Sequence, residues 1–255
     1  MAPVTALVLS GGCLRGFAQI GVLKALAAAG VRPDLVVGAS VGAVIGALFA
    51  AGRTPEEIER LANALVIARL KRWTLSRRGL WSTSGLRELL RQHLPCVSIE
   101  QFPLRFAAVA TDVATGQATV IDRGDASDAI VASAAMPGFF IPATVAGRSY
   151  ADGCLVSPLP VRAARALGAQ RVIAVNTLCD PGHSGGRGLL DVVMRSPRMM
   201  MCALAAHEAS GADLVITPPL SSWHASIATR RQALIDAGER EALGALASYS
   251  LNLAA

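Results

Sequence analysis

Short apolar runs alternate with longer segments of helical spacing along most of this 255-residue chain. Runs typical of buried strands lie at 4–9, 34–37, 106–110, 118–121, 171–175 and 213–216. Helical patterns occupy 17–29, 43–51, 127–135, 159–167, 189–210 and 226–247, and two further helices follow the capping box at Thr54 and the serine at position 84. This alternation predicts an α/β fold of three layers, α/β/α, with a mainly parallel central sheet. The length suits a single domain over residues 1–255.

Two of the predicted strand-to-helix connections are rich in glycine. The first reads Ser10-Gly11-Gly12-Cys13-Leu14-Arg15-Gly16, and the second reads Gly38-Ala39-Ser40-Val41-Gly42. Both follow strands, so in a parallel sheet both lie at the carboxyl edge, where such sheets place their sites.

The second connection has the form G-x-S-x-G. A serine on so sharp a turn exposes its Oγ, while Gly38 and Gly42 let neighbouring segments approach without a Cβ. The helix that follows directs its free N–H groups toward the serine, where they stabilise negative charge. Ser40 is therefore a candidate nucleophile, although a structural glycine-rich turn would give the same five letters.

The first connection exposes successive backbone N–H groups that can bind an anion. A nucleotide phosphate would need the Gly-Lys-Ser/Thr ending, and a dinucleotide would need G-x-G-x-x-G; neither occurs here. The oxyanion of an acyl-transfer intermediate is the third alternative, and it alone makes use of Ser40.

A serine nucleophile also needs a base. None of the four histidines lies at a predicted strand end. His183 and His224 are the alternative candidates for the base, in a Ser-His-Asp triad. Asp152, followed by Gly153, ends a short apolar segment and is the other candidate, although an Asp-Gly pair is also common in plain turns.

Taken together, these motifs resemble the patatin-like phospholipases, in particular small bacterial single-domain members. The resemblance covers nearly the whole chain. It rests on the order of the loop ending Arg15-Gly16, the serine turn, Ala110-Thr111-Asp112, the run Ala132-Ser133-Ala134-Ala135-Met136-Pro137-Gly138, and Asp152-Gly153.

The resemblance implies a Ser–Asp dyad in place of a triad, with Ser40 as nucleophile and Asp152 as its base. It also implies that backbone N–H groups around Gly11, Gly12 and Cys13 form the oxyanion hole. The family's first loop usually reads Gly-Gly-Gly, so Cys13 departs from the pattern and brings a Cβ into the loop. Asp112 has a weaker claim to be the acid and is expected to buttress a turn near the site.

The composition adds exclusions. Five cysteines, without a C-x-x-C pair, argue against a disulfide framework and favour a reducing compartment. The sequence shows no metal-ligand cluster and predicts no cofactor. The N-terminus lacks the charged segment that begins a signal peptide. We therefore expect the protein in the cytoplasm, either free or bound to the inner face of the membrane.

The net charge of +6 is concentrated in one window, residues 69–91. This window holds seven Arg and Lys residues against Glu88 alone, together with Trp73 and Trp81. Basic groups with tryptophan suit an anionic lipid surface. A solvated loop whose tryptophans pack on the core is the alternative, and no nucleic-acid module accompanies the charge.

The sequence thus predicts a serine acyl hydrolase that acts on phospholipid or lysophospholipid esters. Two alternatives stay open. One is a Ser-His-Asp carboxylesterase, and the other is a membrane-associated regulatory protein that keeps the fold with little turnover.

Overall fold

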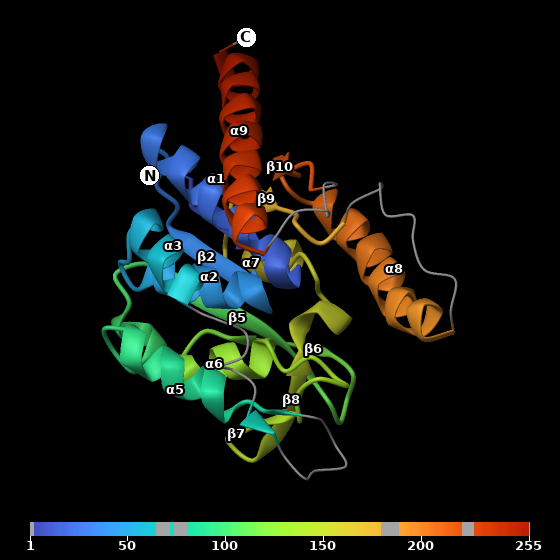
Figure 1. Cartoon of the computed structure of the whole chain (residues 1–255). Helices are drawn as coiled ribbons and strands as arrows, with labels where there is room; N and C mark the ends of the chain where they lie inside the picture. The colour runs from blue at the N-terminus through green and yellow to red at the C-terminus, as the bar shows by residue number, and fades with distance from the viewer. Residues whose placement is uncertain (1–2, 65–71, 74–80, 180–188, 221–226, 255) are drawn as a thin grey trace.

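A computed structural model of the chain describes residues 3–64, 72–73, 81–179, 189–220 and 227–254 (Figure 1). The strands are β1 (Thr5–Leu9), β2 (Leu35–Ala39), β3 (Arg72–Trp73), β4 (Trp81–Ser82), β5 (Arg105–Asp112), β6 (Ala118–Ile121), β7 (Ala143–Val145), β8 (Arg148–Asp152), β9 (Arg171–Val175) and β10 (Leu214–Ile216). The α-helices are α1 (Phe17–Ala28), α2 (Val41–Ala50), α3 (Pro55–Ala64), α5 (Ser84–His93), α6 (Ala126–Ser133), α7 (Val161–Ala166), α8 (Leu189–Ala209) and α9 (Ile227–Ala254). Short 3-10 helices are η1 (Cys13–Gly16), η2 (Ile99–Gln101) and η3 (Gly153–Leu155).

The main sheet has the order β10-β9-β1-β2-β5-β8-β7, with β6 also paired to β5. The pairs from β10 to β5 are parallel, whereas β6, β8 and β7 join antiparallel. The sequence prediction of a mainly parallel sheet is therefore confirmed. Since β1 and β2 are adjacent and parallel, the two glycine-rich connections leave the same edge of the sheet side by side.

Side chains alternate between the two faces of the sheet, as strand geometry requires. In β1, Leu7 and Leu9 pack into the core beneath α1, α2, α3, α6 and α9. Ala6 and Val8 face the other way, into the smaller core that α7 and α8 cover. Helices thus lie on both faces of the sheet, which is the three-layer arrangement that the sequence predicts.

Helix α9 lies along α1 and continues past the sheet to the C-terminus (Figure 1). The two helices approach at glycines. A Cβ on Gly21 of α1 would overlap the backbone carbonyl of Ile235, and a Cβ on Gly238 of α9 would overlap that of Ala18. The bare glycine surfaces therefore allow the helix backbones to touch.

One cysteine pair corrects an expectation from the sequence. Cys179, at the end of the segment after β9, forms a disulfide with Cys202 of α8, with their Cα atoms 5.4 Å apart. Cys13, Cys96 and Cys154 are free. The absence of a C-x-x-C pair misled the prediction because these partners are 23 residues apart in sequence and meet only through the packing of α8. Among the described helices, none combines the length and the apolar character needed to cross a membrane.

Candidate active site

Ser40 stands at the junction of β2 and α2 with φ 55° and ψ −123°. This left-handed φ is uncommon for a residue with a side chain and turns the Oγ out of the path of the backbone. A Cβ on Gly38 would come within 2.5 Å of the Ala43 nitrogen, and one on Gly42 within 2.6 Å of the Ser10 carbonyl oxygen. Both glycines of the turn are thus required for steric reasons, as the motif predicts.

The backbone of Ser40 is held by Ser133 at the end of α6. The Ser40 N–H donates to Ser133 Oγ at 3.0 Å, and this hydroxyl donates to the carbonyl of Val109 in β5 at 2.6 Å. Ser133 is fully buried. Its hydroxyl therefore ties the strained residue to the central sheet. The sequence analysis includes Ser133 in the run at 132–138 but assigns it no such role.

The carboxyl group of Asp152 is the hydrogen-bond partner of Ser40. Ser40 Oγ donates to Asp152 Oδ2 at 2.6 Å, across a separation of 112 residues. The other oxygen, Oδ1, accepts the backbone N–H of Cys154 at 2.8 Å, which fixes the carboxylate plane. Asp152 is fully buried, and Ser40 is 8% exposed.

Two neighbouring contacts position Asp152 itself. Its carbonyl accepts the hydroxyl of Thr111 at 2.7 Å, which secures the pairing of β8 with β5. A Cβ on Gly153 would lie 2.8 Å from the carbonyl carbon of Val109, so only glycine allows the chain to turn so close to β5. Asp152 and Gly153 are therefore buried against strand β5 and do not form an exposed turn.

Burial in the protein interior raises the pKa of Asp152 above its ordinary value, although the bonds from Ser40 and Cys154 oppose this effect. The thiol of Cys154 lies within hydrogen-bonding reach of both Asp152 and Ser40, and burial, followed by the charge of Asp152, raises its pKa well above the ordinary range. Cys154 therefore stays a neutral thiol beside the pair.

The first glycine-rich loop lies against this pair. A Cβ on Gly11 would come 3.5 Å from the Cβ of Ser40 and would overlap the sulfur of Cys154. The N–H of Gly11, however, donates to the carbonyl of Pro158 at 3.1 Å. In the described part of the chain, no hydrogen bond takes up the N–H groups of Gly12 and Cys13. These two amides, rather than that of Gly11, are available to an anion.

Cys13 adopts φ 51°, a left-handed conformation that explains why glycine suits this position. Its side chain is exposed. Nearby, a Cβ on Gly16 would lie 2.6 Å from Val41 Cγ2, so η1 packs directly on the start of α2. Arg15 is buried and donates from Nη1 to the carbonyl of Leu178 at 3.1 Å, so it ties the loop to the segment after β9.

The other candidates from the sequence lie elsewhere. Asp112 accepts the N–H groups of Ala114 and Thr115 at 2.9 and 3.2 Å and forms an ion pair with Arg148, so it buttresses a turn as expected. His183 and His224, the reserve for a triad, lie outside the described residues.

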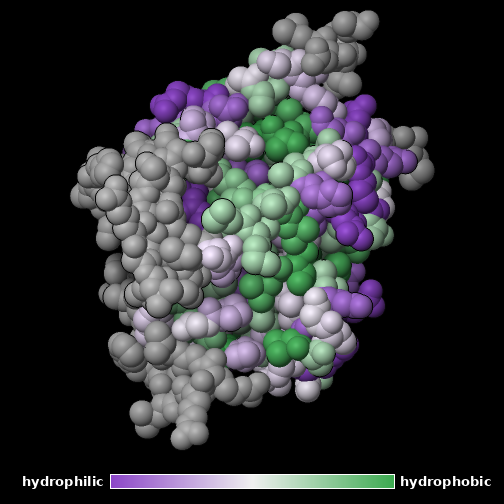
Figure 2. Space-filling model, turned by 90° about the vertical axis from the view of Figure 1, so that its right-hand side faces the viewer, coloured by the Kyte–Doolittle hydropathy of each residue, from purple (hydrophilic) through white to green (hydrophobic). Residues whose placement is uncertain are grey.

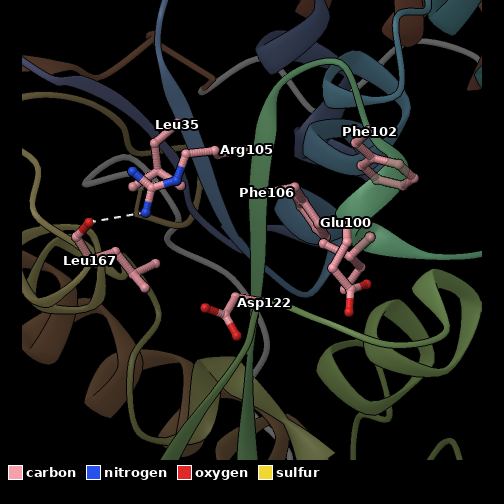
Figure 3. Close-up of a pocket in the computed structure, with 8 residues that line it drawn as sticks. Leu35, Glu100, Phe102, Arg105, Phe106, Asp122 and Leu167 are labelled. Carbon is pink, nitrogen blue, oxygen red and sulfur yellow. Dashed lines mark hydrogen bonds between the residues drawn. The ribbon is translucent and has the colours of Figure 1, made fainter.

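A separate hollow of about 120 Å³ lies at the opposite edge of the sheet (Figure 3). Its lining includes Leu35 and Arg105, the first residues of β2 and β5, whereas Ser40 follows the far end of β2. Arg105 reaches across to the Leu167 carbonyl, and Glu100 and Asp122 supply carboxylates. This hollow is thus remote from the Ser40–Asp152 pair.

Comparisons with known proteins give the family. Residues 7–165 match the family model of the patatin-like phospholipases. The chain is 38% identical over 178 residues to an uncharacterized NTE family protein of Mycobacterium bovis, covering 69% of this chain and 49% of that protein. It is 34% identical over 179 residues to the human patatin-like phospholipase domain-containing protein 6, covering 67% of this chain and 13% of that protein. The chain belongs to the patatin-like phospholipase family, and it spans about half the length of its mycobacterial relative.

Solved structures show the same fold. VipD from Legionella pneumophila superposes with a TM-score of 0.67 at 14% identity, covering 97% of this chain and 67% of that chain. The type III effector protein ExoU superposes with a TM-score of 0.53 at 16% identity, covering 98% and 53%. At such identities, these similarities establish the arrangement of sheet and helices alone.

Proposed function

We propose that this protein is a serine acyl hydrolase that cleaves fatty-acyl ester bonds of phospholipids or lysophospholipids through a dyad of Ser40 and Asp152. The observation that carries the proposal is the 2.6 Å hydrogen bond from Ser40 Oγ to the buried Asp152 carboxylate. Membership of the patatin-like phospholipase family supports the choice of a lipid ester as substrate.

In the proposed reaction, Ser40 Oγ attacks the ester carbonyl while Asp152 Oδ2 accepts its proton. The carbonyl oxygen becomes an oxyanion, which the N–H groups of Gly12 and Cys13 stabilise. Asp152 then returns the proton to the departing alkoxide, which leaves an acyl-enzyme. Water attacks the acyl-enzyme with Asp152 again accepting a proton, and fatty acid and free Ser40 result.

The environment of Asp152 suits a general base. Burial raises its pKa, and a carboxylate of higher pKa takes a proton from a hydroxyl more readily than an ordinary one. The N–H of Cys154 holds the carboxylate so that Oδ2 faces Ser40. No described residue provides a cluster of metal ligands, and the mechanism uses none.

The decisive experiment measures fatty-acid release from p-nitrophenyl esters and from phospholipid vesicles. We expect Ser40→Ala and Asp152→Asn each to lower kcat by three orders of magnitude or more, roughly as removal of a triad member does. Ser127→Ala, which removes a buried hydroxyl from α6 away from the site, serves as the control and keeps full activity.

The alternatives give different results. If Asp152→Asn stays active and His183→Ala or His224→Ala does not, the protein is a Ser-His-Asp carboxylesterase. If the wild type binds vesicles and releases no fatty acid from any ester, it is a regulatory member of the fold.

We further propose that the chain acts as one domain and meets its substrate at an anionic membrane from the cytoplasmic side. The close packing of α9 on α1 supports a single unit that extends beyond the matched residues 7–165. Met199 and Met200 of α8 are 72% and 73% exposed. Figure 2 views the side of the molecule that carries α8, and hydrophobic residues form a band there beside hydrophilic ones.

In the basic window at 69–91, two of the seven basic side chains are paired with acids. Arg87 and Arg91 form ion pairs with Asp128 and Asp125 at 2.7 and 3.4 Å. The ring of Trp81 stacks on Phe139 at 5.8 Å. Residues 69–71 and 74–80 lie outside the described residues.

A vesicle co-sedimentation series tests the remaining charges. We expect replacement of Arg72, Arg77 and Arg78 by glutamine to weaken binding to anionic vesicles at low salt, because each basic group contributes about 1 kcal/mol near such a surface. Hydrolysis of a soluble short-chain ester is unaffected. Equal binding of wild type and variant at every salt concentration would exclude this window as a docking surface.

A further inference from the structure

The peptide between Gly11 and Gly12 is held by two buried hydroxyl groups. Ser10 Oγ donates to the carbonyl oxygen of Gly11 at 2.8 Å, and Thr177 Oγ1 donates to the same oxygen at 3.2 Å. Both side chains are fully buried. Thr177 lies 166 residues from Gly11 in sequence, in the segment after β9, so this contact exists only in the folded protein.

Other hydrogen bonds limit where the two hydroxyl protons can point. Ser10 Oγ accepts the backbone N–H of Thr177 at 2.8 Å, and Thr177 Oγ1 accepts Nε2 of Gln19 at 3.1 Å. Gln19, itself fully buried, also donates to the carbonyl of Ser10 at 2.7 Å. Each hydroxyl has one proton to donate. Ser10 Oγ and Thr177 Oγ1 also lie 3.3 Å apart, so one of them can donate to the other, and the remaining hydroxyl then donates to the Gly11 carbonyl.

This carbonyl decides the direction of the next amide. In a planar trans peptide, C=O and N–H point in opposite directions, so the Gly12 N–H points away from Ser10 and Thr177. Glycine on both sides gives the peptide little orientation preference of its own. A Cβ built on Gly11 would come 3.5 Å from the Cβ of Ser40, so this peptide lies beside the candidate nucleophile. The two hydroxyls thus set an orientation that the Gly-Gly backbone leaves open.

We propose that Ser10 and Thr177, supported by Gln19, are positioning residues that hold the Gly12 N–H toward the oxyanion formed at Ser40. The inference rests on the proposed acyl hydrolase function and adds residues to it. Hydroxyl donation to the carbonyl also polarises the peptide and strengthens its N–H as a donor. None of the three side chains needs to contact the substrate.

The test compares Ser10→Ala, Thr177→Val and the double variant with wild type on a soluble p-nitrophenyl ester. We expect each single variant to lower kcat about tenfold, and the double variant to approach the loss of roughly 10²- to 10³-fold that removal of an oxyanion donor causes. KM stays within about twofold, because the oxyanion exists only after attack. Thr177→Ser retains the hydroxyl and restores most of kcat, and Ser127→Ala is the control for loss of a buried hydroxyl.

A second measurement separates positioning from a general loosening of the site. A trifluoromethyl ketone analogue accepts Ser40 Oγ at its carbonyl carbon, so that a C–O bond forms, the carbonyl electrons move to oxygen and the serine proton passes to Asp152. The corresponding alcohol forms no oxyanion. We expect the variants to bind the ketone more weakly by the factor lost in kcat and to bind the alcohol as wild type does.

The outcomes distinguish the two levels of proposal. A wild type that hydrolyses no ester and does not bind the ketone refutes the proposed function itself. An active wild type with Ser10→Ala and Thr177→Val at full kcat refutes the positioning role, as does an equal loss of ketone and alcohol binding. If Thr177→Val does not fold by circular dichroism, Ser10→Ala and Thr177→Ser carry the same comparison.

Discussion

At the scale of the residue, the role proposed for Asp152 conflicts with its surroundings. In the proposed mechanism its carboxylate is charged so that it can accept a proton from Ser40, yet it is fully buried. Hydrogen bonds from Ser40 and the Cys154 N–H favour the charged form, but burial outweighs them and raises the pKa. The Asp152 carboxylate is thus a stronger base than that of an ordinary aspartate, because its surroundings disfavour the charged form.

This conflict predicts how stability depends on pH. A carboxyl group whose folded pKa exceeds the unfolded value of 3.8 stabilises the fold at low pH, and this stabilisation is lost as pH rises through the folded pKa. Asp152→Asn removes the titration. We therefore expect the variant to be more stable than wild type at pH 7, with the difference shrinking as pH falls toward 4.

Urea unfolding of both proteins between pH 4 and pH 8 measures this difference, with Asp122→Asn, an exchange at the remote hollow, as control. The acidic limb of kcat/KM should lie above the pH range of an ordinary aspartate for the same reason. A wild type that is the more stable protein at pH 7 would show that its hydrogen bonds outweigh burial.

Site residues could be predicted from the sequence only where they belong to a short contiguous motif. The turn around Ser40 and the Asp152-Gly153 pair are contiguous patterns with steric reasons that the structure makes plain. Ser133 and Thr177 are ordinary polar residues in the sequence. Their contacts to Ser40 and Gly11 span 93 and 166 residues, so only the folded chain reveals them. The sequence also places the N–H of Gly11 in the predicted oxyanion hole. Its hydrogen bond to the carbonyl of Pro158, far away in the sequence, is seen only in the folded chain.

At the scale of the element, the buried parallel strands and most helices could be predicted, whereas the sheet edge could not. Parallel strand β9 has the predicted bounds, because four buried apolar residues follow Arg171. The bounds of β6, an antiparallel neighbour of β5, also agree with the prediction. The strands β7 and β8 were missed, since Ala143–Val145 is only three residues long and Arg148–Asp152 begins with exposed polar residues. They become strands through antiparallel pairing with each other and with β5.

The crossing of α1 and α9 gives a prediction with a control in the same helix. Gly238→Ala places a methyl group against the backbone of Ala18, so we expect a loss of about 1–3 kcal/mol in the free energy of unfolding, as for an overpacked core contact. Gly244 of α9 has open space around its Cα, and Gly244→Ala should gain about 0.5–1 kcal/mol from helix propensity.

Urea denaturation of the two variants decides the matter. Opposite signs support direct backbone contact between α1 and α9. Two gains of similar size would mean that α9 does not dock on α1 in solution, which would also weaken the proposal of a single domain over the whole chain.

At the scale of the whole molecule, the segment after β9 connects the site with α8. Thr177 and Leu178 contact the glycine-rich loop, through the Gly11 carbonyl and the Arg15 guanidinium. The next residue, Cys179, is bonded to Cys202 of α8, and α8 also contributes Glu208, which accepts the hydroxyl of Ser157 at 2.6 Å. Helix α8 is therefore fixed near the carboxyl ends of the parallel strands, where Ser40 lies, by the disulfide and by the hydrogen bond of Glu208.

The disulfide between Cys179 and Cys202 predicts that the free energy of unfolding depends on redox conditions. The disulfide closes a loop with a sequence separation of 23 residues, so its loss should lower the free energy of unfolding by about 2–4 kcal/mol. Dithiothreitol and Cys202→Ala should have the same effect, and the reductant should add nothing to the variant. Cys96→Ala, at a free and partly buried cysteine, is the control and should leave the response to reductant intact.

Because a reducing cytoplasm would open the Cys179–Cys202 disulfide, a cytoplasmic location requires the form of the protein in which both cysteines are free. Thiol counting on protein isolated under acid quench would show which form exists in the cell: five free thiols agree with the cytoplasmic prediction, and three contradict it.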